Sequence, residues 1–198
     1  LKVVVLESDV TLRDRARKWL DDQGIYGRQI QVVSWASEEL PDYFANLIVS
    51  EGMLREGKPG SYSPEEIYRV LRPFSGEAVF GVLNKVKNVE GFSIEEWWKQ
   101  SGATEKDTIA DLSGQESWFK SWFQITRNEL IGSGSWKGLY GNAANTASTD
   151  DQLVKGPLGV LWFGEPGSEH MLERHSRTVG PLAVNGRLFV QGMELVQA

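Results

Sequence analysis

The first 22 residues constrain the fold of this chain most strongly. Residues 2–9 hold a run of four apolar residues that closes on an acidic tip, and a helical pattern over residues 11–22 follows at once. An uninterrupted apolar strand joined directly to an amphipathic helix is typical of a parallel α/β sheet that is covered on both faces. We therefore expect residues 2–9 to be a buried parallel strand and Asp9 to be the N-cap of the helix.

The helix after this strand should pack on the sheet. Leu12, Ala16, Trp19 and Leu20 recur at helical spacing, so they fall on one face, and Gly24 provides a stop signal near the C-terminus. We expect that face to be buried.

The next 60 residues continue the alternation of strands and helices. Strands are predicted at residues 30–35, 44–50 and 76–82, with a turn at residues 40–42 between the first two. Ser63 followed by Pro64 and two glutamates predicts a helix over residues 64–71, because Pro favours the first helical position and acids favour the first turn. The fold class of this part is α/β.

One segment resembles a known family. The run Glu65-Glu66-Ile67-Tyr68-Arg69-Val70-Leu71-Arg72-Pro73-Phe74-Ser75-Gly76 is similar to the Glu-x-x-Arg-Val-Leu-Lys/Arg-Pro-Gly-Gly segment before the fifth strand of class I S-adenosylmethionine-dependent methyltransferases. Residues 44–51 resemble the fourth strand of that family and residues 2–9 its second. The resemblance covers residues 1–82, with a poorer continuation to about 131, and implies a Rossmann-like sheet.

The resemblance implies a cofactor site at the tips of the strands. Glu7 stands where the family places an acid that binds both ribose hydroxyls, and a carboxylate can accept two hydrogen bonds from a vicinal diol. From spacing alone, a solvated loop acid explains Glu7 equally well. By the same resemblance, Ser34, Trp35 and Ala36 would border the adenine. Ser50 and Glu51 would lie near the reacting face, and S-adenosylmethionine is the implied cofactor.

Three features depart from the family pattern. The chain has Trp35-Ala36-Ser37 where the family often has an acid near the adenine, and Pro73-Phe74-Ser75-Gly76 in place of Pro-Gly-Gly. The first strand and its glycine-rich loop are also missing, and that strand belongs between the second and the fourth. We therefore expect a gap in the sheet with two unpaired parallel edges, which an upstream strand of the same protein or another segment would fill. Residues 1–131 would be an N-terminally incomplete domain and the chain a fragment.

The following segment is richer in tryptophan. Ser93-Ile94-Glu95-Glu96 is a capping-box pattern that predicts a helix with Trp97 and Trp98, whose rings should be core. Residues 101–115 are polar and predict a loop. Residues 118–125, which hold Trp118, Phe119, Trp122, Phe123 and Ile125, predict a helix ending in a strand, with an aromatic ligand platform as an alternative to core packing.

Residues 132–198 differ in character from the α/β part of the chain. The composition of residues 131–135 predicts a flexible linker. Residues 136–148 carry a Trp, a Tyr-Gly pair and an Asn-Thr segment, and residues 157–162 predict a short strand. With these features, residues 132–198 resemble the start of a quinoprotein-like (PQQ-like repeat) β-propeller. Residues 181–192 predict two strands joined by a type I′ turn at Asn185-Gly186. This order of domains resembles large bacterial fusion proteins, so the remaining propeller is expected from the same protein.

Composition and motifs argue against several other classes. The net charge is −6 and the basic residues are scattered, which argues against nucleic acid as a partner. No apolar stretch approaches the ~20 residues of a membrane span, and cysteine is absent. His170 and His175 could supply metal ligands or a general base, but their spacing does not match His-Glu-x-x-His, and a polar loop is the favoured interpretation. Neither a metal site nor a PQQ site is visible.

The leading functional hypothesis is S-adenosylmethionine binding. Methyl transfer to an unknown acceptor is a possible activity, but no residue is a convincing base for it. The first alternative is a non-catalytic scaffold or protein-interaction module. A weaker one is part of a quinone-dependent oxidoreductase whose site lies downstream. The residues do not decide the compartment, and the propeller resemblance is consistent with a bacterial periplasmic or secreted protein.

Overall fold

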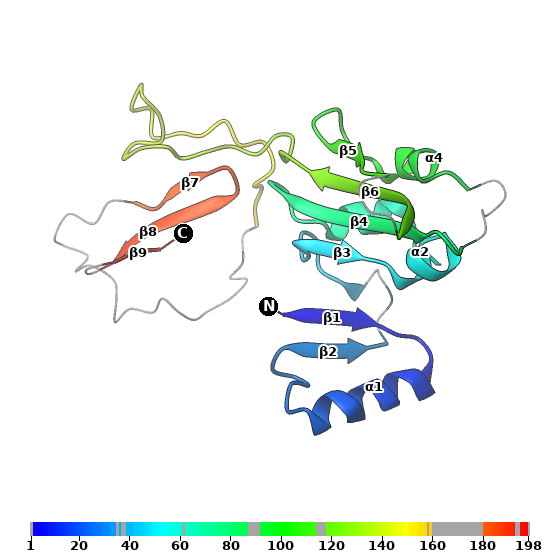
Figure 1. Cartoon of the computed structure of the whole chain (residues 1–198). Helices are drawn as coiled ribbons and strands as arrows, with labels where there is room; N and C mark the ends of the chain where they lie inside the picture. Colours follow the sequence, from blue (N-terminus) through cyan, green and yellow to red (C-terminus); the bar gives the residue numbers. More distant parts are fainter. Residues whose placement is uncertain are drawn as a thin grey trace. The chain divides into compact units, whose positions relative to one another are not determined.

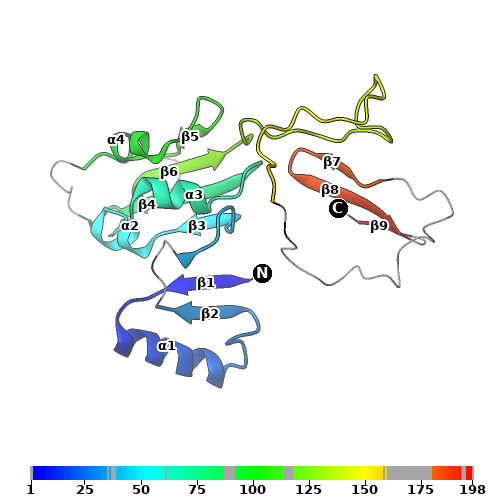
Figure 2. The ribbon, with the colours of Figure 1, turned by 180° about the vertical axis from the view of Figure 1, so that it is seen from behind.

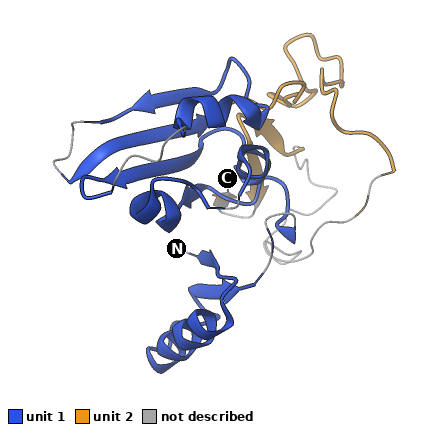
Figure 3. Ribbon diagram, turned by 90° about the vertical axis from the view of Figure 1, so that its right-hand side faces the viewer, with its two compact units in different colours: residues 1–127 blue, residues 128–198 orange. Residues whose placement is uncertain are grey.

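The computed structural model describes residues 2–34, 36, 39–60, 62–86, 92–113, 118–157, 159, 180–192 and 195–197. The chain divides into two compact units, Leu1–Arg127 and Asn128–Ala198 (Figure 3). The elements of unit 1 are β1 (Val3–Leu6), α1 (Val10–Asp22), β2 (Ile30–Val33), β3 (Leu47–Val49), α2 (Glu51–Glu56), α3 (Pro64–Val70), β4 (Gly76–Leu83), α4 (Ile94–Trp98), the 3-10 helix η2 (Lys99–Ser101), β5 (Thr108–Asp111) and β6 (Phe119–Arg127). Unit 2 contains β7 (Leu182–Val184), β8 (Arg187–Gly192) and β9 (Leu195–Gln197).

Unit 1 is a mixed α/β structure whose strands form two sheets. β1 pairs in parallel with β2, and a second sheet has the order β3-β4-β6-β5 (Figure 1). β3 and β4 are parallel, whereas β6 runs antiparallel to both β4 and β5. Among the described strands, none pairs with the second edge of β1 or of β3. The predicted interruption of the sheet, with two unpaired parallel edges, is therefore confirmed.

The helix after β1 begins as predicted but packs less than predicted. The Asp9 carboxylate accepts a hydrogen bond from the Leu12 N–H at 2.9 Å, so Asp9 is the N-cap. On the face that should be buried, only Leu20 is buried, whereas Leu12 is 53% and Trp19 60% exposed. The prediction was wrong for these two side chains because the two-stranded sheet β1-β2 gives α1 too narrow a surface to cover.

α3 is held at both ends. Ser63 is its N-cap and accepts a hydrogen bond from the Glu66 N–H, as predicted. At the C-terminal end the buried Arg127 guanidinium donates to the carbonyl oxygens of Tyr68 and Leu71, and its Cζ atom lies 4.0 Å from the centre of the Tyr68 ring. Arg127 of β6 thereby satisfies helix carbonyls that have no partner within the helix.

The hydrophobic core of unit 1 lies between the four-stranded sheet and its helices. Phe80 of β4 and Ile125 of β6 are fully buried. Trp98 is almost fully buried, and the Trp97 ring packs edge-on against Phe80 with a centroid separation of 5.9 Å. Trp98 is therefore a core residue and Trp97 packs against the core, as predicted. The buried core residues are Met53, Ile67, Leu71, Ala78, Phe80, Ile94, Trp98, Phe123 and Ile125.

Two further predictions on unit 1 were wrong. Residues 108–111, predicted as loop, form β5, and the helix expected from Trp118 is absent because residues 119–127 form one continuous strand, β6. β6 pairs with β4 on one side and β5 on the other, so the backbone hydrogen bonds of two neighbours favour the strand. Phe123 and Ile125 are buried, so core packing is confirmed for these two residues.

Unit 2 contains a three-stranded antiparallel sheet, β7-β8-β9 (Figure 2). Asn185 and Gly186 join β7 to β8 with φ angles of 50° and 71°, which fits the predicted type I′ hairpin. The predicted flexible linker at residues 131–135 is instead tied to a neighbouring loop. The Gly134 N–H donates to the Asp151 carboxylate at 2.8 Å, and the Gln152 N–H donates to the Gly132 carbonyl. Of the strand predicted at residues 157–162, residues 158 and 160–162 lie outside the described residues.

Candidate functional site

Glu7 lies directly after β1, at the carboxyl end of the strand. Its N–H donates to the Val33 carbonyl of β2, so the backbone pairing continues to this residue. One carboxylate oxygen, Oε1, accepts the Asp9 N–H at 2.8 Å. The guanidinium of Arg13 donates to the Glu7 carbonyl at 3.3 Å. Glu7 is thus a partly buried carboxylate whose orientation is set by the first residues of the helix.

The residues predicted to border the adenine follow β2. Ser34 is exposed and follows Val33, so it lies beside Glu7 at the same end of the two-stranded sheet. Ala36 is exposed, and its N–H donates to the Glu39 carboxylate at 2.7 Å. Trp35 and Ser37 lie outside the described residues.

Ser50 and Glu51 follow β3 and are occupied by local contacts. Ser50 is the N-cap of α2 and accepts a hydrogen bond from the Met53 N–H. The Glu51 carboxylate forms an exposed ion pair with Arg55 at 2.8 Å. The carboxyl ends of β1, β2 and β3 point in the same direction (Figures 1 and 2). The structure therefore brings Glu7 and Ser34 together at the end of one sheet and holds Ser50 and Glu51 at the end of the other.

Tyr62 was not predicted as a site residue. Burial raises the pKa of its phenol, and the negative charge of Glu7 raises that pKa further. Tyr62 also packs against the core through its ring. The two residues are 55 positions apart in the sequence, so no local pattern could have linked Tyr62 to Glu7.

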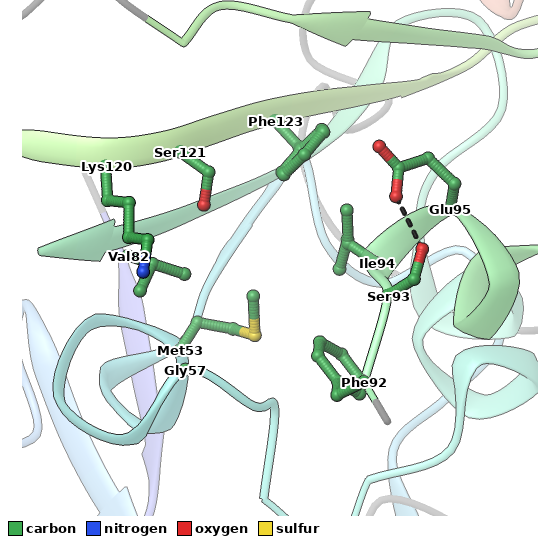
Figure 4. Close-up of a pocket in the computed structure, with 10 residues that line it drawn as sticks. All are labelled: Met53, Gly57, Val82, Phe92, Ser93, Ile94, Glu95, Lys120, Ser121 and Phe123. Carbon is green, nitrogen blue, oxygen red and sulfur yellow. Dashed lines mark hydrogen bonds between the residues drawn. The ribbon is translucent and has the colours of Figure 1, made fainter. Parts of the chain in front are cut away.

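A separate cavity of about 460 Å³ lies between α2, the end of β4, the start of β6 and the segment that opens α4 (Figure 4). It is lined by Met53, Gly57, Val82, Phe92, Ser93, Ile94, Glu95, Lys120, Ser121 and Phe123. None of the described residues predicted for the cofactor site lines it, whereas Phe123 belongs to the group with the alternative interpretation as an aromatic platform.

The described part of the chain shows neither a metal-binding cluster nor a membrane-spanning helix. Within it, no group of three or more His, Cys, Asp or Glu side chains is placed to hold a metal ion. The same ranges contain no helix with the length and hydropathy needed to cross a membrane. His170 and His175 lie outside the described residues.

Comparisons with known proteins give one weak structural similarity. No protein-family model and no curated protein matches the chain. Among solved structures, the chain is similar to a SAM-dependent methyltransferase from Aquifex aeolicus, with 17% sequence identity and a TM-score of 0.42. The match covers 63% of this chain and 67% of that chain. A similarity at this level does not show a family, so any functional assignment depends on the side chains themselves.

Proposed function

We propose that unit 1 is a methyltransferase-like domain that binds S-adenosylmethionine. The observation that carries the proposal is the position of Glu7, a carboxylate fixed by the Asp9 N–H at the carboxyl end of a parallel strand. Ligands of open α/β sheets bind outside the carboxyl ends of the strands. A carboxylate in that place can accept hydrogen bonds from both hydroxyls of a ribose.

In this proposal the remaining residues surround the cofactor. The loop that contains Ser34, Trp35 and Ala36 borders the adenine, and Ser50 and Glu51 lie towards the reacting methyl group. S-adenosylmethionine supplies that methyl group when it is bound. Methyl transfer to an acceptor is part of the proposal only as an activity to be tested.

The experiment is a calorimetric titration of the chain with S-adenosylhomocysteine. Glu7→Gln keeps an oxygen that can accept the Asp9 N–H but removes the charge, and we expect it to weaken binding by about 1 to 3 kcal/mol. Glu65→Gln, an exposed acid in the first turn of α3, is the matched control and should bind normally. Adenosine and 2′,3′-dideoxyadenosine provide a second control, because the effect of Glu7→Gln should disappear without the diol.

Two results would overturn the proposal. Absence of binding by the native chain would favour the non-catalytic scaffold. Equal affinity of the native and Glu7→Gln chains would remove Glu7 from the site.

We also propose that residues 132–198 begin a quinoprotein-like β-propeller. The support is the antiparallel sheet β7-β8-β9 with its two-residue turn, together with the backbone pairing of Trp136 with Ala183 of β7. An experimental structure that places residues 182–197 in a sheet other than a propeller blade would contradict this proposal.

A further inference from the structure

The cavity beside α4 has both apolar and polar walls. Met53, Ile94 and Phe123 are 1%, 5% and 8% exposed, and they come from α2, α4 and β6. Val82 at the end of β4 and the Phe92 ring complete the apolar walls. A volume of about 460 Å³ falls within the usual ~300–1,000 Å³ of small-molecule pockets. These walls favour a hydrocarbon or aromatic body.

Two side chains of opposite charge stand on opposite sides of this cavity. Lys120 lies on the side of β6 and Val82, and Glu95 lies across from it on α4 (Figure 4). Ser93 donates a hydrogen bond to Glu95 Oε2 at 2.7 Å and also accepts the Glu96 N–H as the N-cap of the helix. The Glu95 carboxylate is therefore held in place by a side chain that is itself fixed at the helix terminus.

Ser121 adds a polar group between the two charges. Its side chain points from β6 into the cavity, on the same strand as Lys120 (Figure 4). A hydroxyl can both donate and accept, so Ser121 can assist the binding of either an anionic or a neutral polar group.

We propose that this cavity is a binding site for a small bipolar molecule with an apolar middle. A carboxylate at one end of the ligand pairs with the Lys120 ammonium, and an ammonium at the other end pairs with the Glu95 carboxylate. Met53, Val82, Ile94 and Phe123 enclose the apolar body. ω-Amino carboxylates have this chemistry.

This site does not depend on S-adenosylmethionine binding. Its walls share no residue with the proposed cofactor site, in which Glu7 and Ser34 follow different strands. Loss of cofactor binding in Glu7→Gln would leave the inference intact, and an empty cavity would leave the cofactor proposal intact.

The Met53 methyl group gives a direct readout. The chain contains three methionines, so its ¹³C-methyl methionine spectrum is simple, and Met53 is the methionine that lines the cavity among the described residues. The probes are 4-aminobutanoate, 6-aminohexanoate and 8-aminooctanoate. We expect one of them to shift the Met53 signal in a saturable way. Hexanoate and hexylamine, which carry one charge each, should bind about tenfold more weakly than 6-aminohexanoate if that length fits.

Variants that remove a charge show whether the two ends of the ligand bind Lys120 and Glu95, or whether only its apolar body is buried. Lys120→Gln and Glu95→Gln should each weaken binding of the best probe by about tenfold. Glu96→Gln and Lys99→Gln are the matched controls, because these residues form an exposed ion pair near α4 outside the cavity and should change nothing. Failure of all three probes to move the Met53 signal would overturn the inference. Equal affinity for probes with one charge and two, or unchanged affinity in both variants, would also overturn it.

Discussion

At the scale of single residues, the turn before β4 is the clearest case of a backbone conformation that the sequence does not favour. Phe74 and Ser75 have φ angles of 59° and 93°, where glycine is the preferred residue. This is the place where the sequence departs from Pro-Gly-Gly, and the turn keeps a glycine-type backbone nonetheless. The Ser75 N–H donates to the Arg127 carbonyl at 2.9 Å, so pairing with β6 helps to hold it.

Ser75→Gly should therefore stabilise unit 1. The Ser75 side chain is exposed, so its loss removes no buried contact. Glycine relieves the cost of the positive φ angle, and this gain exceeds the cost of the added entropy of the unfolded chain. We expect the free energy of unfolding to rise by about 0.5 to 1 kcal/mol. Gly76→Ala is the opposing control, because a Cβ at Gly76 would lie 2.3 Å from the Arg72 carbonyl oxygen. Urea unfolding measures both changes. A destabilised Ser75→Gly chain would show that the φ angle is not under strain.

The same scale explains why part of the candidate site was predictable and part was not. The position of Glu7 at the carboxyl end of β1 follows from the apolar run before it, which is local information, whereas its ribose-binding role is a proposal that comes from the family resemblance. Tyr62 and the pair Lys120 and Glu95 are brought to their places by chain segments far apart in sequence. No spacing rule relates such residues, so the sequence alone could not identify Tyr62 or the cavity.

At the scale of elements, helix starts were predictable and the strand β6 was not. Asp9, Ser63 and Ser93 each accept a backbone N–H three residues ahead, which is a contact within one turn of the chain. β6 depends on β4 and β5 for its backbone partners. The apolar spacing of Trp118, Trp122 and Ile125 also fits a helix, so the local pattern could not decide between the two structures.

The unpaired edge of β1 leads to a prediction on amide exchange. The N–H groups of Val3 and Glu7 donate to the carbonyl oxygens of Gln29, just before β2, and Val33 of β2. The alternation of a parallel strand therefore turns the N–H groups of Val4 and Leu6 to the opposite edge. We expect Val4 and Leu6 to exchange at least 100-fold faster than Val3 and Val5 in hydrogen exchange followed by NMR.

β4 is the internal control for this experiment, because β3 and β6 flank it and its consecutive amides around Ala78 should all be protected. β3 is likewise an edge strand of the second sheet among the described strands. Slow exchange at both Val4 and Leu6 would mean that another strand occupies the edge of β1 in solution.

At the scale of the whole molecule, each unit has its own internal contacts. In unit 1 the core spans α2, α3, α4 and the four-stranded sheet. In unit 2, residues 130–134 are linked to residues 149–154 through Asp151, whose carboxylate accepts the N–H groups of Gly134, Leu153 and Val154. Hydrogen bonds from the Val154 and Gly134 backbones lower the pKa of Asp151, so the carboxylate should stay charged at neutral pH.

Gly134 offers a way to test whether the units respond separately. A Cβ at this position would lie 2.2 Å from Thr149 Oγ1 and 2.5 Å from the Asp151 backbone nitrogen, so Gly134→Ala must push the two segments apart. We expect faster amide exchange over residues 149–154 and no change over β4 and β6. Gly138→Ala is the matched control, because nothing lies within 4 Å of the added Cβ. An equal increase in the amide exchange of β4 and β6 would show that the two units unfold together. Gly134 belongs to unit 2, so its substitution could affect the core of unit 1 only if both units unfold in one cooperative transition.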